Sequence, residues 1–512
     1  MSKQVSVHSG DTMRSLDDVK TRAACFATGM DQSGIGHGDR IAIIMRNEIT
    51  FLELTMAAGL LGATPVPINW HWAGDDLAHA LSNSGVKMAI AHTDLLPAVQ
   101  ARALADVAVI EAAVPAEVSK AYGLGEPPLT MKLPSVQSWA QKCDPWVKDA
   151  PPAPMSVIYS SGTTGQAKGI LRNPIADEDK PIVVKNVADL WHLAPGESTL
   201  IPAPLYHSAP NVHASFAAAL GMNIHIMPRF DGEEFLRIVH KHRINSVQMV
   251  PTMFTRLLQL PEHVRNKYDV SSLRAVVHAA SPCPTHIKQG MIDWFGPIVY
   301  EYYGGAEIGA WTAADSTEAL SRPGTVGRPI LDSRIRILDS AGQEKPPGED
   351  GIIYGRNFTG WPDFTYIDDH SKRQQMEVDG YLTLGDIGRL DADGYLYLSD
   401  RLNDMVISGG VNIYPAEIEA SLLQLDAVVD VAVFGIPDAT WGESLAAHIQ
   451  LAPDAVLSET DVQDHVKATL ADYKVPREVV FVTELPREDT GKLFKRLLQE
   501  KYWPASDSKR AG

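Results

Sequence analysis

The segment YSSGTTGQAKGILR, from Tyr159 to Arg172, has the composition of a loop that binds a phosphate group. Its glycines allow the backbone to turn so that several N–H groups point at one anion, and its hydroxyls and lysine add donors and positive charge. The common nucleotide-binding pattern places Gly directly before Lys and a hydroxyl residue directly after it. Here Ala167 precedes Lys168 and Gly169 follows it. The sequence therefore predicts phosphate binding by a loop of a different type.

Three further segments combine turn residues with charged side chains. YYGGAE covers residues 302–307, TLGDIG covers residues 383–388, and LPREDTGKLFKR covers residues 485–496. The first follows an apolar run typical of a strand, and so does the phosphate loop. Ligands of open α/β sheets gather where loops leave the carboxyl ends of the strands. We therefore expect the phosphate loop and YYGGAE to lie where ligands of such sheets bind.

The elements that must position these loops alternate along the first part of the chain. The pattern over residues 15–30 predicts a helix that starts with a capping box, Ser15 and Asp18, and places apolar residues on one face. RIAIIM at residues 40–45 predicts a buried strand, and FLELTMAAGLLG predicts a helix that ends at Gly62. Such alternation favours an α/β fold, with parallel or mixed sheets covered by helices.

The pattern changes near residues 398–410, where shorter helices and strands follow one another. We predict a large N-terminal domain over residues 1–400 and a small, mobile α+β domain over residues 401–512. A length of 512 residues is consistent with two domains.

Composition excludes several classes of function. The formal net charge of −18 argues against a nucleic-acid-binding protein, which needs a basic face. No apolar run reaches the length of about 18 residues that a membrane-spanning helix requires. The three scattered cysteines fit a reducing compartment, so we expect a cytoplasmic protein. The pair His240 and His242, in a charged helical pattern, is interpreted as a solvated face.

Taken in order, these motifs resemble those of the adenylate-forming superfamily of acyl-CoA synthetases, luciferases and peptide-synthetase adenylation domains. YSSGTTGQAKG resembles its phosphate loop, YYGGAE its adenine and magnesium loop, and YLTLGDIG its ribose motif. DRLNDMVISGGVNIYPAEIE is similar to its hinge, and LPREDTGKLFKR to its C-terminal lysine motif. The resemblance covers nearly the whole chain.

The resemblance implies an enzyme that uses ATP, Mg²⁺ and CoA. A carboxylate attacks the α-phosphate of ATP, pyrophosphate leaves, and a thiol then displaces AMP from the acyl-adenylate. Because the first step brings a carboxylate against a polyphosphate, the protein must neutralise charge and align the reacting groups. The resemblance assigns ATP contacts to Ser160, Ser161, Gly162, Thr163, Thr164, Gly165, Lys168, Ala280, Tyr303, Gly304, Asp386 and Arg401. It assigns catalysis to Lys492, Glu307 and His207, magnesium to Glu307, the acyl pocket to His207 and Gly305, the hinge to Asn403, and CoA contacts to Ser408, Gly409 and Gly410.

Three positions depart from the family pattern. The family usually has proline at Ala167, threonine at Ala306, and aspartate or lysine at Asn403. The threonine donates to the α-phosphate in the family, so Ala306 removes one hydrogen bond worth about 1.5–3 kcal/mol when its partner is charged.

The sequence favours an acyl-CoA ligase that acts on a bulky, ring-bearing or aryl acid. Two alternatives stay open: a synthetase that transfers the acyl group to an amine, and a fatty-acid–CoA ligase. A luciferase-like oxidation reaction would use the same motifs and also stays open. The alanine at position 306 leaves a further alternative, an ATP-binding sensor without catalytic activity. A peptide-synthetase module is disfavoured because only about twenty residues follow Lys492 and because PLYHSAPN offers no carboxylate for a substrate ammonium. The sequence does not determine the oligomeric state and leaves a homodimer open.

Overall fold

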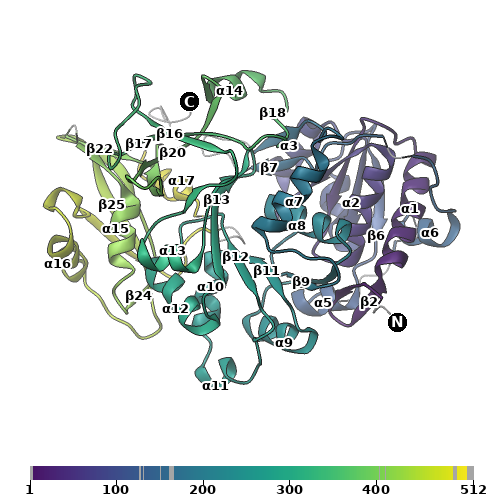
Figure 1. The fold of residues 1–512 in the computed structure, drawn as a ribbon, viewed down its shortest axis with the longest axis horizontal. Coiled ribbons are helices and arrows are strands. Elements are labelled where there is room, and N and C mark those ends of the chain that lie inside the picture. Colours follow the sequence, from purple (N-terminus) through teal and green to yellow (C-terminus); the bar gives the residue numbers. More distant parts are fainter. Residues whose placement is uncertain are drawn as a thin grey trace.

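The computed structural model describes residues 4–125, 129–130, 132–149, 151–160, 167–402, 404–409, 411–487 and 493–503. Figure 1 shows the N-terminal elements at one end of the molecule and the C-terminal elements, including β22, β25 and α16, at the opposite end. This is the predicted arrangement of a large α/β part followed by a smaller mixed part. No helix among the described residues combines the length and apolar character needed to cross a bilayer.

Two sheets with parallel centres form the body of the large part. The nine-stranded sheet runs β15 (Arg328–Pro329), β14 (Gly309–Ala314), β13 (Val299–Gly305), β12 (Ala275–His278), β11 (Ser246–Met249), β9 (Ser198–Ile201), β10 (Asn223–Ile226), β1 (Ser6–Ser9) and β2 (Thr12–Ser15). The four-stranded sheet runs β4 (Thr64–Pro67), β3 (Arg40–Ile44), β5 (Met88–His92) and β6 (Ala108–Ala112). All strands of the smaller sheet are parallel, whereas the larger sheet is antiparallel at both edges.

Helices α1 (Leu16–Gln32), α2 (Ile49–Leu61) and α8 (Ser208–Ala219) contribute to one continuous apolar core with residues of both sheets. The predicted helix start is confirmed, because Ser15 Oγ accepts a hydrogen bond from the Asp18 N–H at 3.0 Å. The predicted end of α2 is also confirmed: Gly62 has a φ of 67°, a left-handed conformation that glycine adopts without steric cost. Helices α9 (Gly232–His242), α10 (Pro251–Leu258) and α12 (Thr285–Phe295) pack in a second core against the nine-stranded sheet.

Two small sheets contain residues of two predicted motifs, the phosphate loop and TLGDIG. One contains β7 (Ile158–Ser160), β8 (Lys168–Arg172) and β18 (Phe364–Tyr366). The other contains β16 (Arg334–Leu338), β17 (Gly351–Arg356), β19 (Glu377–Val378), β20 (Tyr381–Leu390) and β21 (Leu396–Arg401). The antiparallel pairing of β20 with β21 places Asp386 opposite Arg401.

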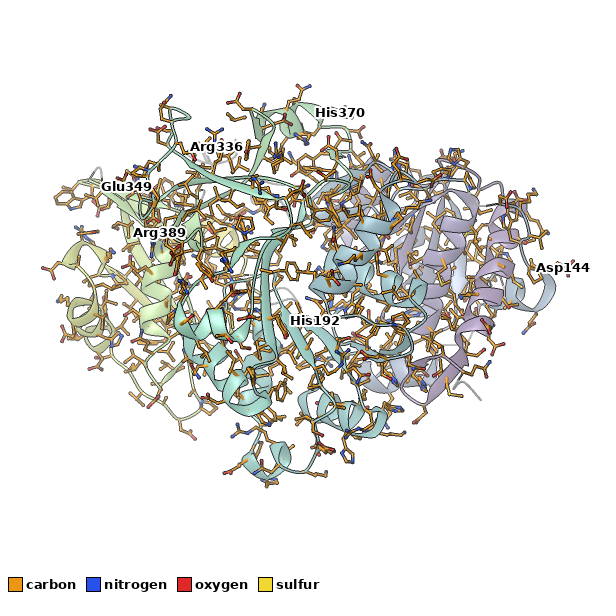
Figure 2. All side chains as sticks on the ribbon, viewed as in Figure 1. Asp144, His192, Arg336, Glu349, His370 and Arg389 are labelled. Atoms are coloured by element: carbon orange, nitrogen blue, oxygen red, sulfur yellow. The ribbon has the colours of Figure 1, made fainter. Side chains whose placement is uncertain are left out.

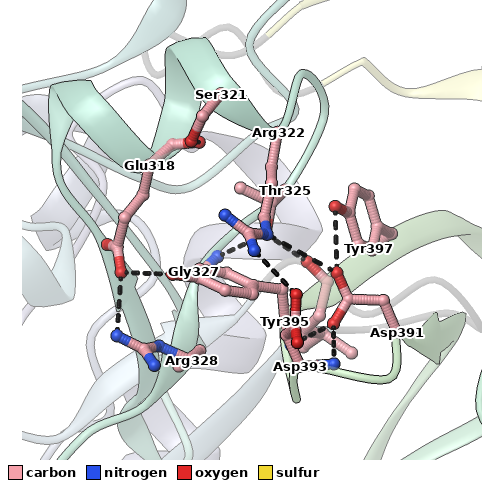
Figure 3. Close-up of polar contacts among 11 residues, drawn as sticks. Glu318, Ser321, Arg322, Thr325, Gly327, Arg328, Asp391, Asp393, Tyr395 and Tyr397 are labelled. Atoms are coloured by element: carbon pink, nitrogen blue, oxygen red, sulfur yellow. Dashed lines mark hydrogen bonds and ion pairs between the residues drawn. The ribbon is translucent and has the colours of Figure 1, made fainter.

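A polar network joins the β20–β21 hairpin to the segment around α13 (Ser316–Ser321), as Figure 3 shows. Its contacts are Tyr395 to Glu318 at 2.9 Å, Arg328 to Glu318 at 3.2 Å, Arg322 to Asp393 at 2.7 Å and Tyr397 to Asp391 at 3.3 Å. Single exposed pairs contribute little, but a network that shares partners orients its side chains together. The hairpin that carries Asp386 is thereby attached beside β15, the edge strand of the nine-stranded sheet.

The C-terminal part has its own sheet and core. Its strands run β23 (Val411–Ile413), β22 (Val406–Ser408), β25 (Gly442–Leu451) and β24 (Val428–Asp438), and β26 (Glu478–Val482) pairs with β25. Helices α15 (Pro415–Leu422), α16 (Glu459–Thr469) and α17 (Lys495–Gln499) accompany this sheet. The strands and helices predicted after the pattern change are therefore confirmed.

Candidate active site

A cavity of about 2100 Å³ lies between the small sheets, the end of the nine-stranded sheet and the C-terminal part. Arg389, labelled in Figure 2, lines this cavity, and its Nη1 is 3.4 Å from Oδ1 of Asp350, which also lines it. The cavity is lined by Ser160, Lys168, His207, Ala280, Tyr303, Gly304, Gly305, Glu307, Asp386 and Arg401. The structure thus brings together every predicted ATP and acyl residue that it describes.

Five of the predicted ATP residues, residues 161–165, lie outside the described part of the chain, as do Asn403, Gly410 and Lys492. The predicted CoA residues Ser408 and Gly409 are described but do not line the cavity. Gly409 follows β22, has a φ of 57° and leaves no room for a side chain, since a Cβ would lie 2.6 Å from Trp441.

Tyr303, Asp386 and Arg401 form a connected polar group on the cavity wall. The Tyr303 hydroxyl donates to Asp386 Oδ2 at 2.7 Å, and Arg401 Nε lies 3.4 Å from Asp386 Oδ1. Burial and the neighbouring Asp386 raise the pKa of Tyr303 well above its usual value, so its hydroxyl remains a donor. The Asp386 carboxylate is consequently held by contacts to both of its oxygens.

Glu307 is held by contacts from β18 and β8. The Tyr366 hydroxyl donates to Glu307 Oε1 at 3.0 Å, and Arg172 Nη2 donates to the carbonyl oxygen of Ala306. Arg172 is fully buried, and this burial lowers its pKa to about 10, while the charge of Glu307 opposes the shift. Sequence analysis did not single out Arg172, although an arginine that ends a buried strand is unusual enough to signal a site.

Lys168 provides positive charge at the start of β8. Its Nζ contacts Asp369 Oδ2 at 2.5 Å, and Lys372 lies close by in α14 (His370–Gln375). Burial and the charge of Lys168 lower the pKa of Lys372. Two ammonium groups that face one cavity favour a polyanion there, because it relieves their mutual repulsion. Lys372 was missed in the sequence because it belongs to an ordinary surface helix pattern.

His207 precedes α8, and its imidazole packs against Tyr206 with ring centroids 4.4 Å apart. The loop before it is fixed by Asn47, whose side chain donates to the Ala203 carbonyl at 2.8 Å and accepts from the Leu205 N–H at 2.7 Å. His207 thus has a defined place beside the cavity, and its assignment as a gate for the carboxylate stays a prediction.

Ala280 follows β12 in a left-handed conformation, with a φ of 79°. A non-glycine residue in this region stores strain, and such strain is concentrated at functional sites. Another buried group in the cavity wall is the ion pair between Lys288 and Glu301. His278 Nδ1 lies 3.9 Å from the same carboxylate. The sequence did not reveal this buried group, because its members come from three separate elements.

The comparisons with known proteins agree with this geometry. The model of the AMP-binding enzyme family matches residues 2–358, and the model of the AMP-binding enzyme C-terminal domain matches residues 417–492. The chain belongs to the AMP-binding enzyme family. The predicted resemblance to adenylate-forming enzymes is therefore confirmed.

Individual members of the AMP-binding enzyme family align along nearly the whole chain. The chain is 30% identical over 496 residues to the long-chain-fatty-acid–CoA ligase FadD13 of Mycobacterium tuberculosis, covering 96% of this chain and 93% of the relative. It is 29% identical over 508 residues to the feruloyl-CoA synthase of an Amycolatopsis species, covering 97% and 96%. The predicted enzyme class, acid–thiol ligase, is thus the class of these relatives.

The fold of this AMP-binding enzyme also matches solved structures. The amide bond synthetase McbA from Marinactinospora thermotolerans superposes with a TM-score of 0.83 at 22% identity, covering 98% of this chain and 97% of that chain. At this identity the likeness shows a shared fold. The predicted α/β architecture with a smaller C-terminal part is confirmed by this match.

Proposed function

We propose that the chain activates a carboxylic acid with ATP and transfers the acyl group to CoA. The acid carboxylate attacks the α-phosphate, pyrophosphate leaves, and the CoA thiol displaces AMP from the acyl-adenylate. The observation that carries this proposal is the convergence of Lys168, Glu307 and Asp386 on one cavity. Lys168 and Lys372 supply positive charge for the phosphates, and Asp386 supplies acceptors for the ribose hydroxyls.

Glu307 would hold Mg²⁺, because carboxylate oxygens are the ligands that this cation prefers, and Tyr366 fixes the carboxylate from one side. The bound ion would neutralise charge on the phosphates. Within the chain, Arg172 holds the Ala306 carbonyl, so the backbone that carries Glu307 keeps its place. Lys492, outside the described residues, is the proposed cation between the substrate carboxylate and the α-phosphate.

We propose a ring-bearing or aryl acid as the substrate. Apolar and aromatic side chains line part of the cavity, among them Trp191, Tyr302, Phe358 and Trp361. Flat rings fit walls of this kind through edge and face contacts. The feruloyl-CoA synthase among the relatives supports this choice, whereas FadD13 supports a fatty acid. AMP release across a panel of aryl, steroid and fatty acids tests it, and a preference for long unbranched acids would contradict it.

The proposed domain boundary lies between residues 400 and 401, with the C-terminal domain rotating between the two half-reactions. The β20–β21 sheet ends at Arg401 and the sheet of β22 begins at Val406, which supports a boundary close to this position. A cytoplasmic location is proposed because Cys25, Cys143 and Cys283 are all free thiols. A homodimer stays a prediction.

CoA is expected to be required for rapid product release. Without an acceptor thiol, the acyl-adenylate stays bound, and AMP release falls to the rate of its hydrolysis or escape. The measurement is steady-state AMP formation with CoA, with a simple amine, and with neither acceptor. Turnover with the amine equal to that with CoA would favour the amide-forming alternative, for which the fold match to McbA is the supporting observation.

Ala306→Thr is expected to leave the adenylation rate unchanged or to raise it. The hydroxyl restores a donor beside the α-phosphate, and Ala306 is only partly buried, so the extra atoms have access to the cavity. The measurement is acid-dependent exchange of pyrophosphate into ATP. Ala306→Val is the matched control, because it adds the same bulk without a donor. A collapse of exchange in the threonine variant with its fold intact would show that Ala306 makes room for the substrate.

A further inference from the structure

Three histidines from separate elements meet where α9 packs against the nine-stranded sheet, and none of them lines the cavity. His8 lies on β1 and His225 on β10, and the parallel register of these neighbouring strands pairs the two residues directly. His242 is the last residue of α9. Their ring centroids are 4.4 Å apart for His8 and His225 and 4.3 Å apart for His225 and His242. One ring nitrogen from each lies within 4.8 Å of the others.

This arrangement corrects the interpretation of His240 and His242 as a solvated face. His240 is exposed, as expected, and its Nδ1 accepts from the Asp269 N–H at 3.1 Å. His242 is not a solvated residue: it is half-buried against His8 and His225. The helical periodicity could not reveal this, because both partners lie far away in the sequence.

Hydrogen bonds fix the orientation of the His8 ring. Ser6 Oγ contacts His8 Nε2 at 2.8 Å and Asn223 Oδ1 at 3.3 Å, and in the tautomer whose Nε2 carries the proton the imidazole donates to Ser6 Oγ while the hydroxyl donates to Asn223. The Asn223 oxygen is identified by the Ser6 N–H, which also donates to it at 3.0 Å. With Nε2 protonated, His8 Nδ1 keeps its lone pair. A ring fixed in this way by its second nitrogen is typical of histidines that bind metals.

Histidine binds a metal ion through a neutral imidazole nitrogen. The C-terminal end of α9 also carries the negative end of the helix dipole, which favours a cation beside His242.

We propose that His8, His225 and His242 form a zinc-binding site that links the N-terminal strand β1 to β10 and α9. Three imidazole nitrogens and one water complete a tetrahedral Zn²⁺ site, with Zn–N distances of about 2.0–2.1 Å and nitrogens therefore roughly 3.3 Å apart. The three nitrogens lie within 4.8 Å of one another, so binding requires the His8 and His242 rings to turn toward the ion and the His8 ring to leave its stacked position on His225. The ion replaces packing of three neutral rings with three covalent-like bonds between elements distant in sequence, so it stabilises the fold.

The test uses the full chain after treatment with a chelator, in buffer without ATP or acid. Co²⁺, a spectroscopic substitute for Zn²⁺, is titrated while visible absorption is recorded. We expect one equivalent to bind with the intense bands of a four-coordinate ion, Zn²⁺ to displace it, and Zn²⁺ to raise the midpoint of thermal unfolding. His8→Asn and His242→Asn should each weaken binding at least about tenfold, since loss of partners behind a ligand already costs that much.

His263→Asn, at an exposed histidine outside the cluster, is the matched control and should bind Co²⁺ as the unchanged chain does. Equal unfolding midpoints of the metal-free variants and the metal-free unchanged chain show that His8 and His242 act as ligands and not only in packing. The proposal is overturned if Co²⁺ gives only the weak bands of six-coordinate ions, or if His8→Asn binds as tightly as His263→Asn.

Discussion

We expect Lys492→Ala to lower the rate of acyl-adenylate formation by about 10²–10³-fold, the usual effect of removing one preorganised donor from a site of developing charge. The same variant should still convert supplied acyl-AMP and CoA into acyl-CoA, because that half-reaction has no pyrophosphate to expel and, in the proposed mechanism, follows rotation of the C-terminal domain. Each half-reaction is measured separately, by pyrophosphate exchange and by acyl-CoA formation.

Lys501→Ala is the control for this experiment, because Lys501 is an exposed lysine in the same domain. It should leave both half-reactions unchanged. Equal loss of both half-reactions in Lys492→Ala, or loss of neither, contradicts the two-conformation mechanism proposed above.

We expect Asp386→Asn to lower kcat/KM for ATP by roughly 10–150-fold, which corresponds to loss of a charge-assisted hydrogen bond of about 1.5–3 kcal/mol. The amide removes the negative charge that pairs with Arg401 at 3.4 Å and one of the two acceptors proposed for the ribose hydroxyls. The KM for the carboxylic acid should change little. Steady-state kinetics with ATP and acid varied in turn separates the two effects.

A substrate analogue makes this prediction specific. The unchanged enzyme should prefer ATP over 2′,3′-dideoxy-ATP, and Asp386→Asn should lose most of this preference, because the ribose hydroxyls of ATP no longer find the carboxylate that accepts their hydrogen bonds. Tyr303→Phe is the control: it removes the hydroxyl that contacts Asp386 at 2.7 Å but keeps the ring and the carboxylate, so the preference should persist. An Asp386→Asn enzyme that discriminates as strongly as the unchanged enzyme would exclude the ribose assignment.

The elements of the fold were predictable where the signal is local. Apolar periodicity and end signals such as Ser15 and Gly62 determine α1 and α2, since a helix is formed by contacts within a few residues. The order of the strands was not predictable. β1 lies between β10 and β2, more than 200 residues from β10 along the chain, and no local pattern encodes such a pairing.

The candidate site shows the same division. Lys168, Glu307 and Asp386 lie in short motifs whose residue types suggest phosphate, magnesium and ribose, and the structure brings them to one cavity. Lys372 belongs to an ordinary surface helix pattern and Arg172 ends a short strand, and only the tertiary structure shows their contacts with Lys168 and with the Ala306 carbonyl. The histidine cluster was missed for this reason too.

A single-turnover experiment tests the central claim most directly. Enzyme in excess over a preferred acid is mixed with ATP and Mg²⁺, quenched, and analysed by mass spectrometry before and after addition of CoA. The account predicts acyl-AMP and pyrophosphate before CoA is added, and conversion of the acyl-AMP to acyl-CoA and AMP in equal amounts afterwards. Formation of ADP and phosphate, or an acyl-AMP that CoA leaves unchanged, would contradict it.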